Sequence, residues 1–361
     1  MTPRQRAARR RELLAWYRAN RRDLPWRRTR DPYAIWISEA MLQQTRVETV
    51  IPYWERFLER FPDVASLAAA DTDDVIGLWA GLGYYSRARN LHRAAQAVVE
   101  RHDGALPDDA ELLRELPGVG RYTAGAVASI AFDQPEPIVD GNVARVLTRL
   151  LGVDGEVSSK PVQTRLWEEA TLLARGEDPG GLNQGLMELG AMVCTPRAPL
   201  CLACPWTRHC VARAEGRQEE LPLKARKKPP RRVEAVAGHL ERRGEVLAVQ
   251  RPKKGLLGGM WELPGGEIAE SETPEEALVR WFRDGLGLSV SGAEDLGSVE
   301  HVFTHRRLRL HVFRCKPASG RVRRQGWDAH RWVRRSGLDA MAFGGPARKA
   351  IALADEHAGR S

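Results

Sequence analysis

The sequence predicts a protein of two domains, an all-helical domain followed by a smaller α+β domain. From residue 13 to about 216, apolar side chains recur at three- and four-residue spacing, which is the period of amphipathic helices. Residues 219–232 are polar, basic and proline-bearing, which is typical of a linker. Beyond them the pattern changes to short runs typical of strands. We therefore predict a helical domain at 1–216, a linker at 217–232 and an α+β domain at 233–361.

Individual elements follow from the same patterns. In the first domain, residues 32–44 and 73–79 are two of the predicted helices. In the second domain we predict a helix at 273–284, because acidic residues occupy its first turn. The predicted strands are 233–240, 246–250, 301–304 and 308–314.

The composition is that of a folded protein that stays in the cytoplasm. Of the 361 residues, 43% are hydrophobic and 29% charged, and no apolar run approaches the roughly 18 residues of a spanning helix. Basic residues 1–11 lead into an amphipathic run, which argues against an export signal. The formal net charge of +9 favours contact with phosphates, as at the bacterial nucleoid. A basic protein without any nucleic-acid role is equally compatible with that charge.

A glycine-bearing turn at 116–120 leads into an apolar, alanine-rich predicted helix. Gly118 and Gly120 let the backbone turn tightly, and the free N–H groups at a helix start attract anions such as a DNA phosphate. An ordinary packing joint between two helices is the alternative. We favour the phosphate site because a Leu-Pro pair precedes the turn and this helix follows it.

Two acidic residues are the candidate catalytic groups. Asp140 stands at a predicted helix start, where Asp is a common structural cap and where N–H groups favour its charged form. Glu39 is a lone carboxyl in an apolar run, and it either faces solvent or points into a pocket with Trp26 and Tyr122. In a pocket, desolvation would raise its pKa and keep it protonated. One neutral and one charged carboxyl form the pair that glycosidic cleavage requires.

Four of the five cysteines lie in the segment 194–210. Their spacing is Cys-x6-Cys-x2-Cys-x5-Cys, formed by Cys194, Cys201, Cys204 and Cys210. Zinc ribbons usually have two close pairs, and this segment has one, so a [4Fe-4S] cluster is the expected cofactor. Four unligated thiols are the alternative. Cys315 stands apart and is expected in the core of the second domain.

These elements, in this order, resemble the endonuclease III superfamily of helix-hairpin-helix DNA glycosylases over residues 12–212. The cysteine spacing matches the superfamily's iron–sulfur signature, and residues 38–47, 79–87 and 139–143 look like its adenine-specific MutY branch. The resemblance implies that Glu39 protonates adenine N7 and later activates water. It implies that Asp140 stabilises the sugar cation.

The same resemblance assigns supporting residues. Tyr122 and Asn142 would support the transition state and orient the carboxylates. The adenine pocket would be formed by Trp26, Arg27, Leu42 and Gln184. Gln44 and Tyr84 would enter the DNA helix around the partner base.

The nature of residue 122 also bears on the type of reaction. A glycosylase that also cuts the DNA backbone works through a Schiff base and needs an amine nucleophile. Tyr122 stands where endonuclease III-like enzymes carry lysine, and Lys160 is the only lysine before Lys224. We therefore expect base removal without efficient strand cleavage.

The second domain resembles the Nudix, or MutT, fold. Gly266, Glu272 and Arg280 keep the opening of its hydrolase motif, but residues 281–287 retain only Asp284 of the carboxylates that bind magnesium. The resemblance therefore implies a binding module and argues against a nucleotide-pool hydrolase.

In the MutY branch this module recognises 8-oxoguanine through a Phe-Ser-His loop. The matching residues here are Phe303, Thr304 and His305, with a plain strand end as the alternative. The sequence thus predicts a monomer that hydrolyses the N-glycosidic bond of adenine paired with 8-oxoguanine or guanine in double-stranded DNA. Another glycosylase of the superfamily and a non-catalytic lesion-binding protein are the alternatives.

Overall fold

The computed structural model of the chain describes residues 1–225, 229–253, 255–303, 305–338 and 341–358. Contacts divide the chain into two compact units, each described by itself. One unit comprises Met1–Leu78 and Arg87–Arg226, and the other comprises Trp79–Ser86 and Lys227–Ser361. The boundary after Arg226 falls inside the predicted linker. Every helix in the described ranges is too short or too polar to span a bilayer.

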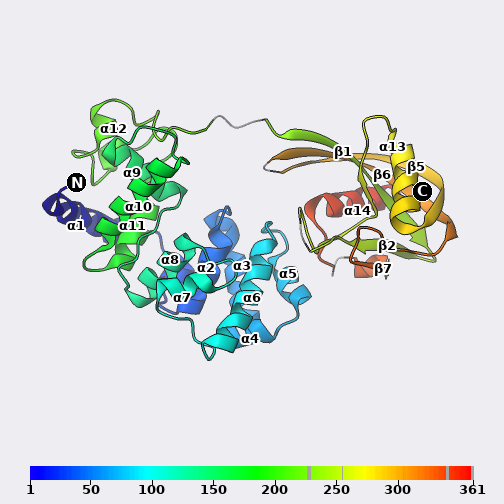
Figure 1. Ribbon diagram of the computed structural model, residues 1–361, viewed down its shortest axis with the longest axis horizontal. Coiled ribbons are helices and arrows are strands. Elements are labelled where there is room, and N and C mark those ends of the chain that lie inside the picture. The colour runs from blue at the N-terminus through cyan, green and yellow to red at the C-terminus, as the bar shows by residue number, and fades with distance from the viewer. Residues whose placement is uncertain (226–228, 254, 304, 339–340, 359–361) are drawn as a thin grey trace. The chain divides into compact units, whose positions relative to one another are not determined.

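The first unit is helical, as predicted (Figure 1). Its helices are α1 (Pro3–Asn20), α2 (Pro32–Leu42), α3 (Val47–Arg60), α4 (Val64–Ala69), α5 (Thr72–Trp79), α6 (Ser86–Arg101), α7 (Ala110–Glu115), α8 (Arg121–Phe132), α9 (Gly141–Leu151), α10 (Lys160–Ala174), α11 (Pro179–Met192) and α12 (Val211–Ala214). Helix α1 begins earlier than its apolar pattern indicates, because Thr2 and Gln5 form a capping box.

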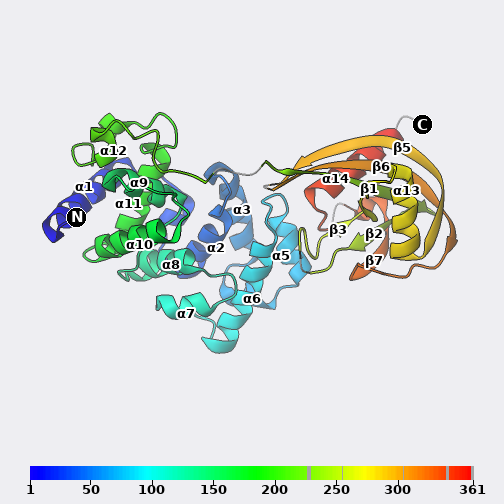
Figure 2. The ribbon, with the colours of Figure 1, turned by 45° about the horizontal axis from the view of Figure 1, so that its top comes forward.

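Helix α11 is the element that holds this unit together, packing against α1, α8 and α9 (Figure 2). Its glycines allow these close approaches. A Cβ atom on Gly190 would lie 2.6 Å from the Cβ of Asn142 in α9, and one on Gly180 would lie 2.5 Å from the Ser129 carbonyl oxygen in α8. On the side of α1, a Cβ atom on Gly185 would lie 3.2 Å from the Cγ of Leu13. The sequence of α11 therefore fixes where three other helices lie.

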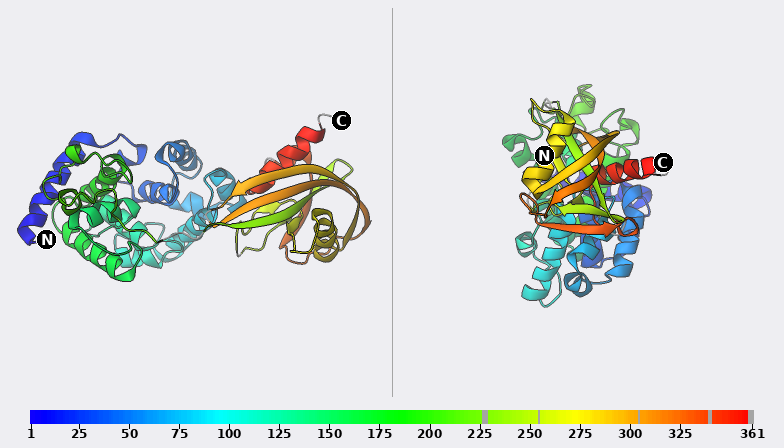
Figure 3. Two further views of the ribbon diagram at one scale, coloured as in Figure 1. Left: turned by 90° about the horizontal axis from the view of Figure 1, so that it is seen from above. Right: turned by 90° about the vertical axis from the view of Figure 1, so that its right-hand side faces the viewer.

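The second unit is a sheet with a helix on each face (Figure 3). The strands are β1 (Arg231–Arg242), β2 (Glu245–Gln250), β3 (Trp261–Glu262), β4 (Gly265–Glu267), β5 (Leu288–Val302), β6 (Arg306–Gly320) and β7 (Ala329–Arg334). Their order is β3-β2-β1-β6-β5, with β4 paired to β1 and β7 to β2. Strands β1 and β6 run parallel, and the other described pairs are antiparallel.

Alternation along the strands separates two apolar cores. In β1, Ala235 and Ala237 point to the core covered by α14 (Gly345–Ala358), whereas Val236 points to the core covered by α13 (Pro274–Arg280). Helix α13 continues into a π-helical turn, Trp281–Leu286, so the predicted helix at 273–284 is confirmed with a modified end. Cys315 is 1% exposed in the α13 core, as expected.

One local prediction is wrong. The strand predicted at 301–304 is only the end of β5, which stops at Val302. The segment 217–232 is not exposed along its whole length, because Leu221 is 1% exposed and its carbonyl accepts a hydrogen bond from Arg149 Nε at 2.8 Å. The two leucines of this polar run, Leu221 and Leu223, give no helical period, so the burial of Leu221 could not be recognised from the pattern.

We expect Gly190→Ala to lower the free energy of unfolding by about 1–3 kcal/mol, because the added methyl overlaps the first turn of α9. Thermal and chemical denaturation measure the change. The matched control is Gly77→Ala in α5, where a Cβ meets no atom within 4 Å. That control should stabilise by up to about 1 kcal/mol through helix propensity alone. Equal effects at both positions would contradict the packing role of α11.

Candidate active site

A cavity of about 450 Å³ lies in the first unit, where α2 and α8 face α9 and α11. Its lining includes nine of the residues selected from the sequence, which are Trp26, Arg27, Glu39, Leu42, Gln44, Tyr122, Asp140, Asn142 and Gln184. These residues come from helices far apart in the chain. The fold therefore brings the two candidate catalytic carboxyls and the four expected adenine-pocket residues to one place.

Glu39 is buried in this cavity and is not on a solvated helix face. It is 4% exposed, and the Tyr122 hydroxyl donates to its Oε2 at 2.7 Å. Burial raises the pKa of Glu39 to about 7, with a further rise from the Asp140 charge, against the lowering effects of Tyr122 and Arg27. A carboxyl with this pKa holds a proton in much of the population at neutral pH.

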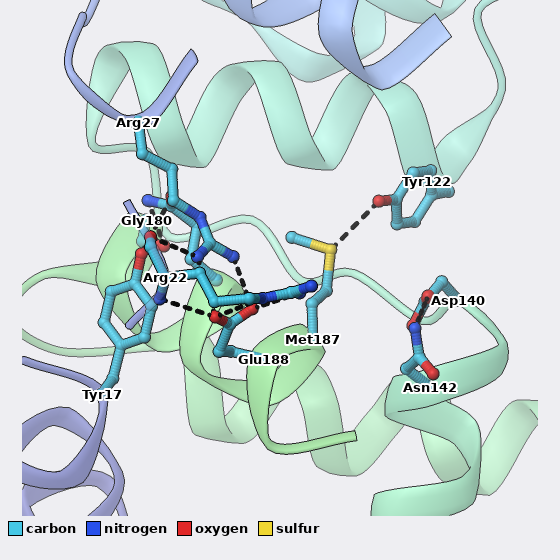
Figure 4. A network of polar contacts seen from close by, with 10 residues as sticks. Tyr17, Arg22, Arg27, Tyr122, Asp140, Asn142, Gly180, Met187 and Glu188 are labelled. Atoms are coloured by element: carbon cyan, nitrogen blue, oxygen red, sulfur yellow. Dashed lines mark hydrogen bonds and ion pairs between the residues drawn. The ribbon is translucent and has the colours of Figure 1, made fainter. Parts of the chain in front are cut away.

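Asp140 is both the N-cap of α9 and part of the cavity wall. Its Oδ1 accepts the Val143 N–H at 2.7 Å, and its Oδ2 accepts the side-chain amide of Asn142 at 3.1 Å (Figure 4). Burial raises the pKa of Asp140, although the N–H groups of Val143 and Asn142 and the charge of Arg145 lower it. The N–H groups at the helix start thus favour the charged form, as the sequence indicates, but burial has the larger effect on this pKa.

The two carboxyls nevertheless differ in what stabilises their charge. Asp140 has backbone N–H groups, an amide and a nearby guanidinium, whereas Glu39 accepts from one hydroxyl. Since two carboxylates in one cavity repel each other, the negative charge is more stable on the carboxyl that receives more hydrogen bonds. The pair therefore favours a charged Asp140 beside a protonated Glu39.

A third buried carboxyl, Glu188, was not selected from the sequence. It is fully buried in α11, and its oxygens accept from Arg22 and Arg27 at 2.8–3.0 Å (Figure 4). These bonds outweigh burial and hold the pKa of Glu188 at about 2. The ion pair fixes the Arg27 guanidinium at the cavity wall, which is what a base-binding arginine requires.

Further contacts shape the cavity from residues that sequence reasoning missed. Met187 Sδ lies 3.1 Å from the Tyr122 hydroxyl, and Tyr17 donates to Gln184 Oε1 at 3.1 Å. Helical spacing could have identified Glu188, because it lies four residues after Gln184 and shares a face of α11 with it. Tyr17 and Arg22 gave no such signal, since both precede the recognised motifs.

Residues expected to enter DNA have unusual backbone conformations. Gln44 has φ 59° and Tyr84 has φ 49°, in the left-handed region that non-glycine residues rarely occupy. Gln44 follows α2, whose last carbonyls, those of Ala40 and Met41, lie 2.8–2.9 Å from the Arg87 guanidinium. Tyr84 is 48% exposed and belongs to the second unit by its contacts. The structure thus places only Gln44 at the cavity.

The glycine turn has the geometry expected of an anion-binding helix start. Gly118 has φ 78°, and a Cβ there would lie 2.5 Å from Asn90, so glycine is required. Gly120 is the N-cap of α8 and offers no side chain to the first N–H groups of that helix. Tyr122 lies in the first turn of the same helix, so this turn adjoins the cavity.

The four clustered cysteines line one small cavity of about 30 Å³. Arg149 Nη1 donates to Cys194 Sγ at 3.3 Å, and the other lining cysteines are Cys201, Cys204 and Cys210. In the described residues, no group of three or more His, Cys, Asp or Glu is arranged to hold a single metal ion. Four cysteine thiols facing one cavity are the chemical type of donor that a four-iron cluster requires.

Phe303 and His305, two of the residues expected to recognise the lesion, lie between β5 and β6. Phe303 donates its N–H to the Arg306 carbonyl at 2.8 Å and lines a cavity of about 450 Å³ within the second unit. His305 is exposed, and Thr304 lies outside the described residues. The retained motif carboxylates are paired, Glu272 with Arg280 and Asp284 with Arg283.

Comparison with known proteins agrees with this arrangement. Residues 37–171 match the HhH-GPD superfamily base excision DNA repair protein family, and residues 235–353 match the NUDIX domain family. Human adenine DNA glycosylase is 41% identical over 83% of this chain and 65% of its own length, and the rat enzyme is 40% identical over 84% and 69%. A thermostable thymine-DNA glycosylase is similar in structure, with a TM-score of 0.54 and 30% identity over 59% of this chain and 98% of that one.

The chain spans about two thirds of the length of these mammalian relatives, and 82% of the length of a relative from Buchnera aphidicola (Acyrthosiphon pisum), which is 35% identical over 81% of this chain. Both matched domains occur in the order that the sequence predicts. The cavity that contains the two candidate catalytic carboxyls lies in the unit that contains the base excision repair match. The chain therefore belongs to the adenine DNA glycosylase family of base excision repair enzymes.

Proposed function

We propose that this chain hydrolyses the N-glycosidic bond of adenine mispaired with 8-oxoguanine or guanine in duplex DNA, without cutting the backbone. The observation that carries this proposal is the pairing of a buried carboxyl of raised pKa, Glu39, with the capped carboxylate Asp140 in one cavity. A duplex base cannot reach such a cavity, so the adenine nucleotide must be flipped out of the helix.

In the proposed reaction, Glu39 acts first as a general acid. Tyr122 donates to Oε2, which leaves the proton of the neutral Glu39 on Oε1 and available to adenine N7. Protonation makes the base a better leaving group, and positive charge develops on the sugar as the bond breaks. The Asp140 carboxylate stabilises that charge. Glu39, now anionic, accepts a proton from the attacking water.

The surrounding residues are proposed to place the nucleotide. Trp26, Arg27, Leu42 and Gln184 would hold the base, and Asn142, through its bond to Asp140, would orient that carboxylate. Gln44 and Tyr84 would fill the space around the partner base. The turn at Gly118 and Gly120 would bind a backbone phosphate through the N–H groups of α8.

In the second unit, the hairpin loop of Phe303, Thr304 and His305 is proposed to recognise the 8-oxoguanine. The exposed position of His305 supports a role in binding. Magnesium-dependent hydrolysis by this unit is not proposed, because the remaining motif carboxylates are engaged by arginines.

A [4Fe-4S] cluster held by Cys194, Cys201, Cys204 and Cys210 is proposed as the cofactor. When bound, such a cluster links the loop 194–210 through four thiolate bonds and supplies a redox-active centre. Arg149, which is 2% exposed, would direct a charge-assisted hydrogen bond to the Cys194 thiolate. The cluster loop would thereby be tied to α9.

We expect Glu39→Gln to lower single-turnover excision on an adenine:8-oxoguanine duplex by about 10²–10⁴-fold, because glutamine cannot donate the proton. The amide oxygen still accepts the Tyr122 hydroxyl, so folding and mismatch binding should stay near wild type. Rates from quenched samples and affinities from gel shifts measure the two effects. Excision within threefold of wild type would show that Glu39 is not the acid.

The excision rate should fall as pH rises through about 7, because only protonated Glu39 is active. Single-turnover rates between pH 5.5 and 9 should decline about tenfold per unit on the alkaline side.

Stability provides the control for this pH profile. The folded pKa of Glu39, about 7, lies above its ordinary value of 4.5, so its contribution to stability is lost as pH rises from about 4.5 to 7. Glu39→Gln should therefore melt at a higher temperature than wild type above pH 7, and the difference should vanish near pH 4. A pH-independent difference would contradict the raised pKa.

Strand cleavage should be absent. Lysine does not occur among the described residues lining the cavity, although Lys224 lines a neighbouring groove together with Asp140. After excision, nicking should require heat or alkali, and borohydride should trap no protein–DNA adduct. A prompt nick that disappears in Lys224→Ala would show that this chain has a lyase activity.

A further inference from the structure

Tyr17 lies behind the cavity wall and contacts two of the side chains expected to hold adenine. It belongs to α1, is 3% exposed, and is not among the described lining residues. Its hydroxyl donates to Gln184 Oε1 at 3.1 Å, and the Arg27 guanidinium lies 5.7 Å from its ring centroid (Figure 4). One buried side chain thus supports both Arg27 and Gln184.

The Gln184 amide can face a base in either of two flipped orientations, because its oxygen accepts hydrogen bonds and its nitrogen donates them. Two contacts favour one of these orientations. The Gly180 carbonyl, which can only accept, faces Nε2 at 3.4 Å. On the other side, the positive Arg21 guanidinium lies 6.0 Å from the Tyr17 ring centroid and favours the orientation in which the hydroxyl oxygen faces it, so the hydroxyl hydrogen is directed to Gln184 Oε1.

Tyr17 also keeps the hydrogen that this arrangement needs. Burial raises the pKa of Tyr17, and this outweighs the lowering effect of Arg27 and Arg21. The phenol therefore stays neutral at all pH values at which the protein is expected to act. A neutral phenol has one hydrogen to donate, and here that hydrogen is donated to Gln184 Oε1.

We propose that Tyr17 is a positioning residue that sets the preference for adenine by locking the Gln184 amide in one orientation. This inference rests on the proposed function. Adenine presents an amino donor at C6 beside the N1 acceptor, and an amide oxygen beside an amide N–H complements that order and leaves N7 to Glu39. Hypoxanthine has an oxygen acceptor at C6 and an N–H donor at N1, so it needs the reversed amide. The fixed orientation of the Gln184 amide therefore disfavours hypoxanthine.

The experiment compares Tyr17→Phe with wild type on duplexes carrying adenine or hypoxanthine opposite 8-oxoguanine. Phenylalanine keeps the ring that packs on Arg27 and removes only the hydroxyl. The adenine rate should fall several-fold and the hypoxanthine rate should stay or rise, so the ratio of the two single-turnover rates should fall about tenfold. A purely structural role would lower both rates equally and leave the ratio unchanged, which would overturn the inference.

The matched control is Tyr33→Phe. Tyr33 is also buried, at 4% exposed, and its hydroxyl donates to the Phe61 carbonyl at 3.0 Å, away from the cavity lining. This variant loses a comparable buried hydrogen bond and should keep the wild-type ratio. In a Gln184→Leu background, adding Tyr17→Phe should leave the ratio where Gln184→Leu alone sets it. A further change there would show that Tyr17 acts by another route.

A second variant tests the same inference if Tyr17→Phe folds poorly. Arg21 is exposed, and Arg21→Leu removes the positive charge that orients the Tyr17 hydroxyl, so the ratio should fall in the same direction by a smaller factor. An unchanged ratio in Arg21→Leu counts against the lock. Failure of the wild-type chain to excise adenine would overturn the proposed function, whereas adenine excision with an unaltered ratio in the variants overturns only this inference.

Discussion

Three carboxyls line one cavity, and the number of hydrogen-bond donors that each one receives decides its charge. Glu188 accepts from two guanidinium groups, and its pKa is about 2. Asp140 accepts from the N–H groups of its own helix start and from Asn142, whereas Glu39 accepts from the Tyr122 hydroxyl, is affected by the charge of Arg27, and has a pKa of about 7. Because an uncompensated buried charge costs several kcal/mol, protonation follows this inventory of donors. The proposed acid, the proposed cation stabiliser and the arginine at the wall all depend on it.

The helices supply these donors because α11 brings them together. Its glycines allow α1, α8 and α9 to approach closely, and its Glu188 binds the arginines that follow α1. Helix α9 then presents Asp140 at its start, and α8 presents Tyr122 in its first turn. No single helix contains the site. A change in the packing of α11 is therefore a change in the geometry of the cavity, even where no lining residue is altered.

The second unit illustrates how a fold can keep its shape after losing the groups of a reaction. The sheet carries a helix on each face, and the opening of the hydrolase motif persists as an ion pair between Glu272 and Arg280. The positions that would complete a magnesium site hold residues such as Trp281 and Phe282, of which Phe282 is buried in the α13 core. At these positions the chain has apolar packing where a magnesium site would need carboxylates, which agrees with the binding role proposed for this unit.

The sequence by itself determined the helical and α+β character of the two parts, the two matched families and the residues to examine, because periodicity, cysteine spacing and short motifs are local properties of the chain. It did not determine whether Glu39 faces solvent or a cavity, since a helix with apolar residues around it has no marked inner face. Only the tertiary structure decided that Glu39 and Asp140 share a cavity, that burial raises the pKa of both, and that Tyr17, Arg22 and Glu188 support the site. Burial and long-range donors depend on segments more than 80 residues apart, as in the bond between Tyr122 and Glu39, and no local pattern records such partners.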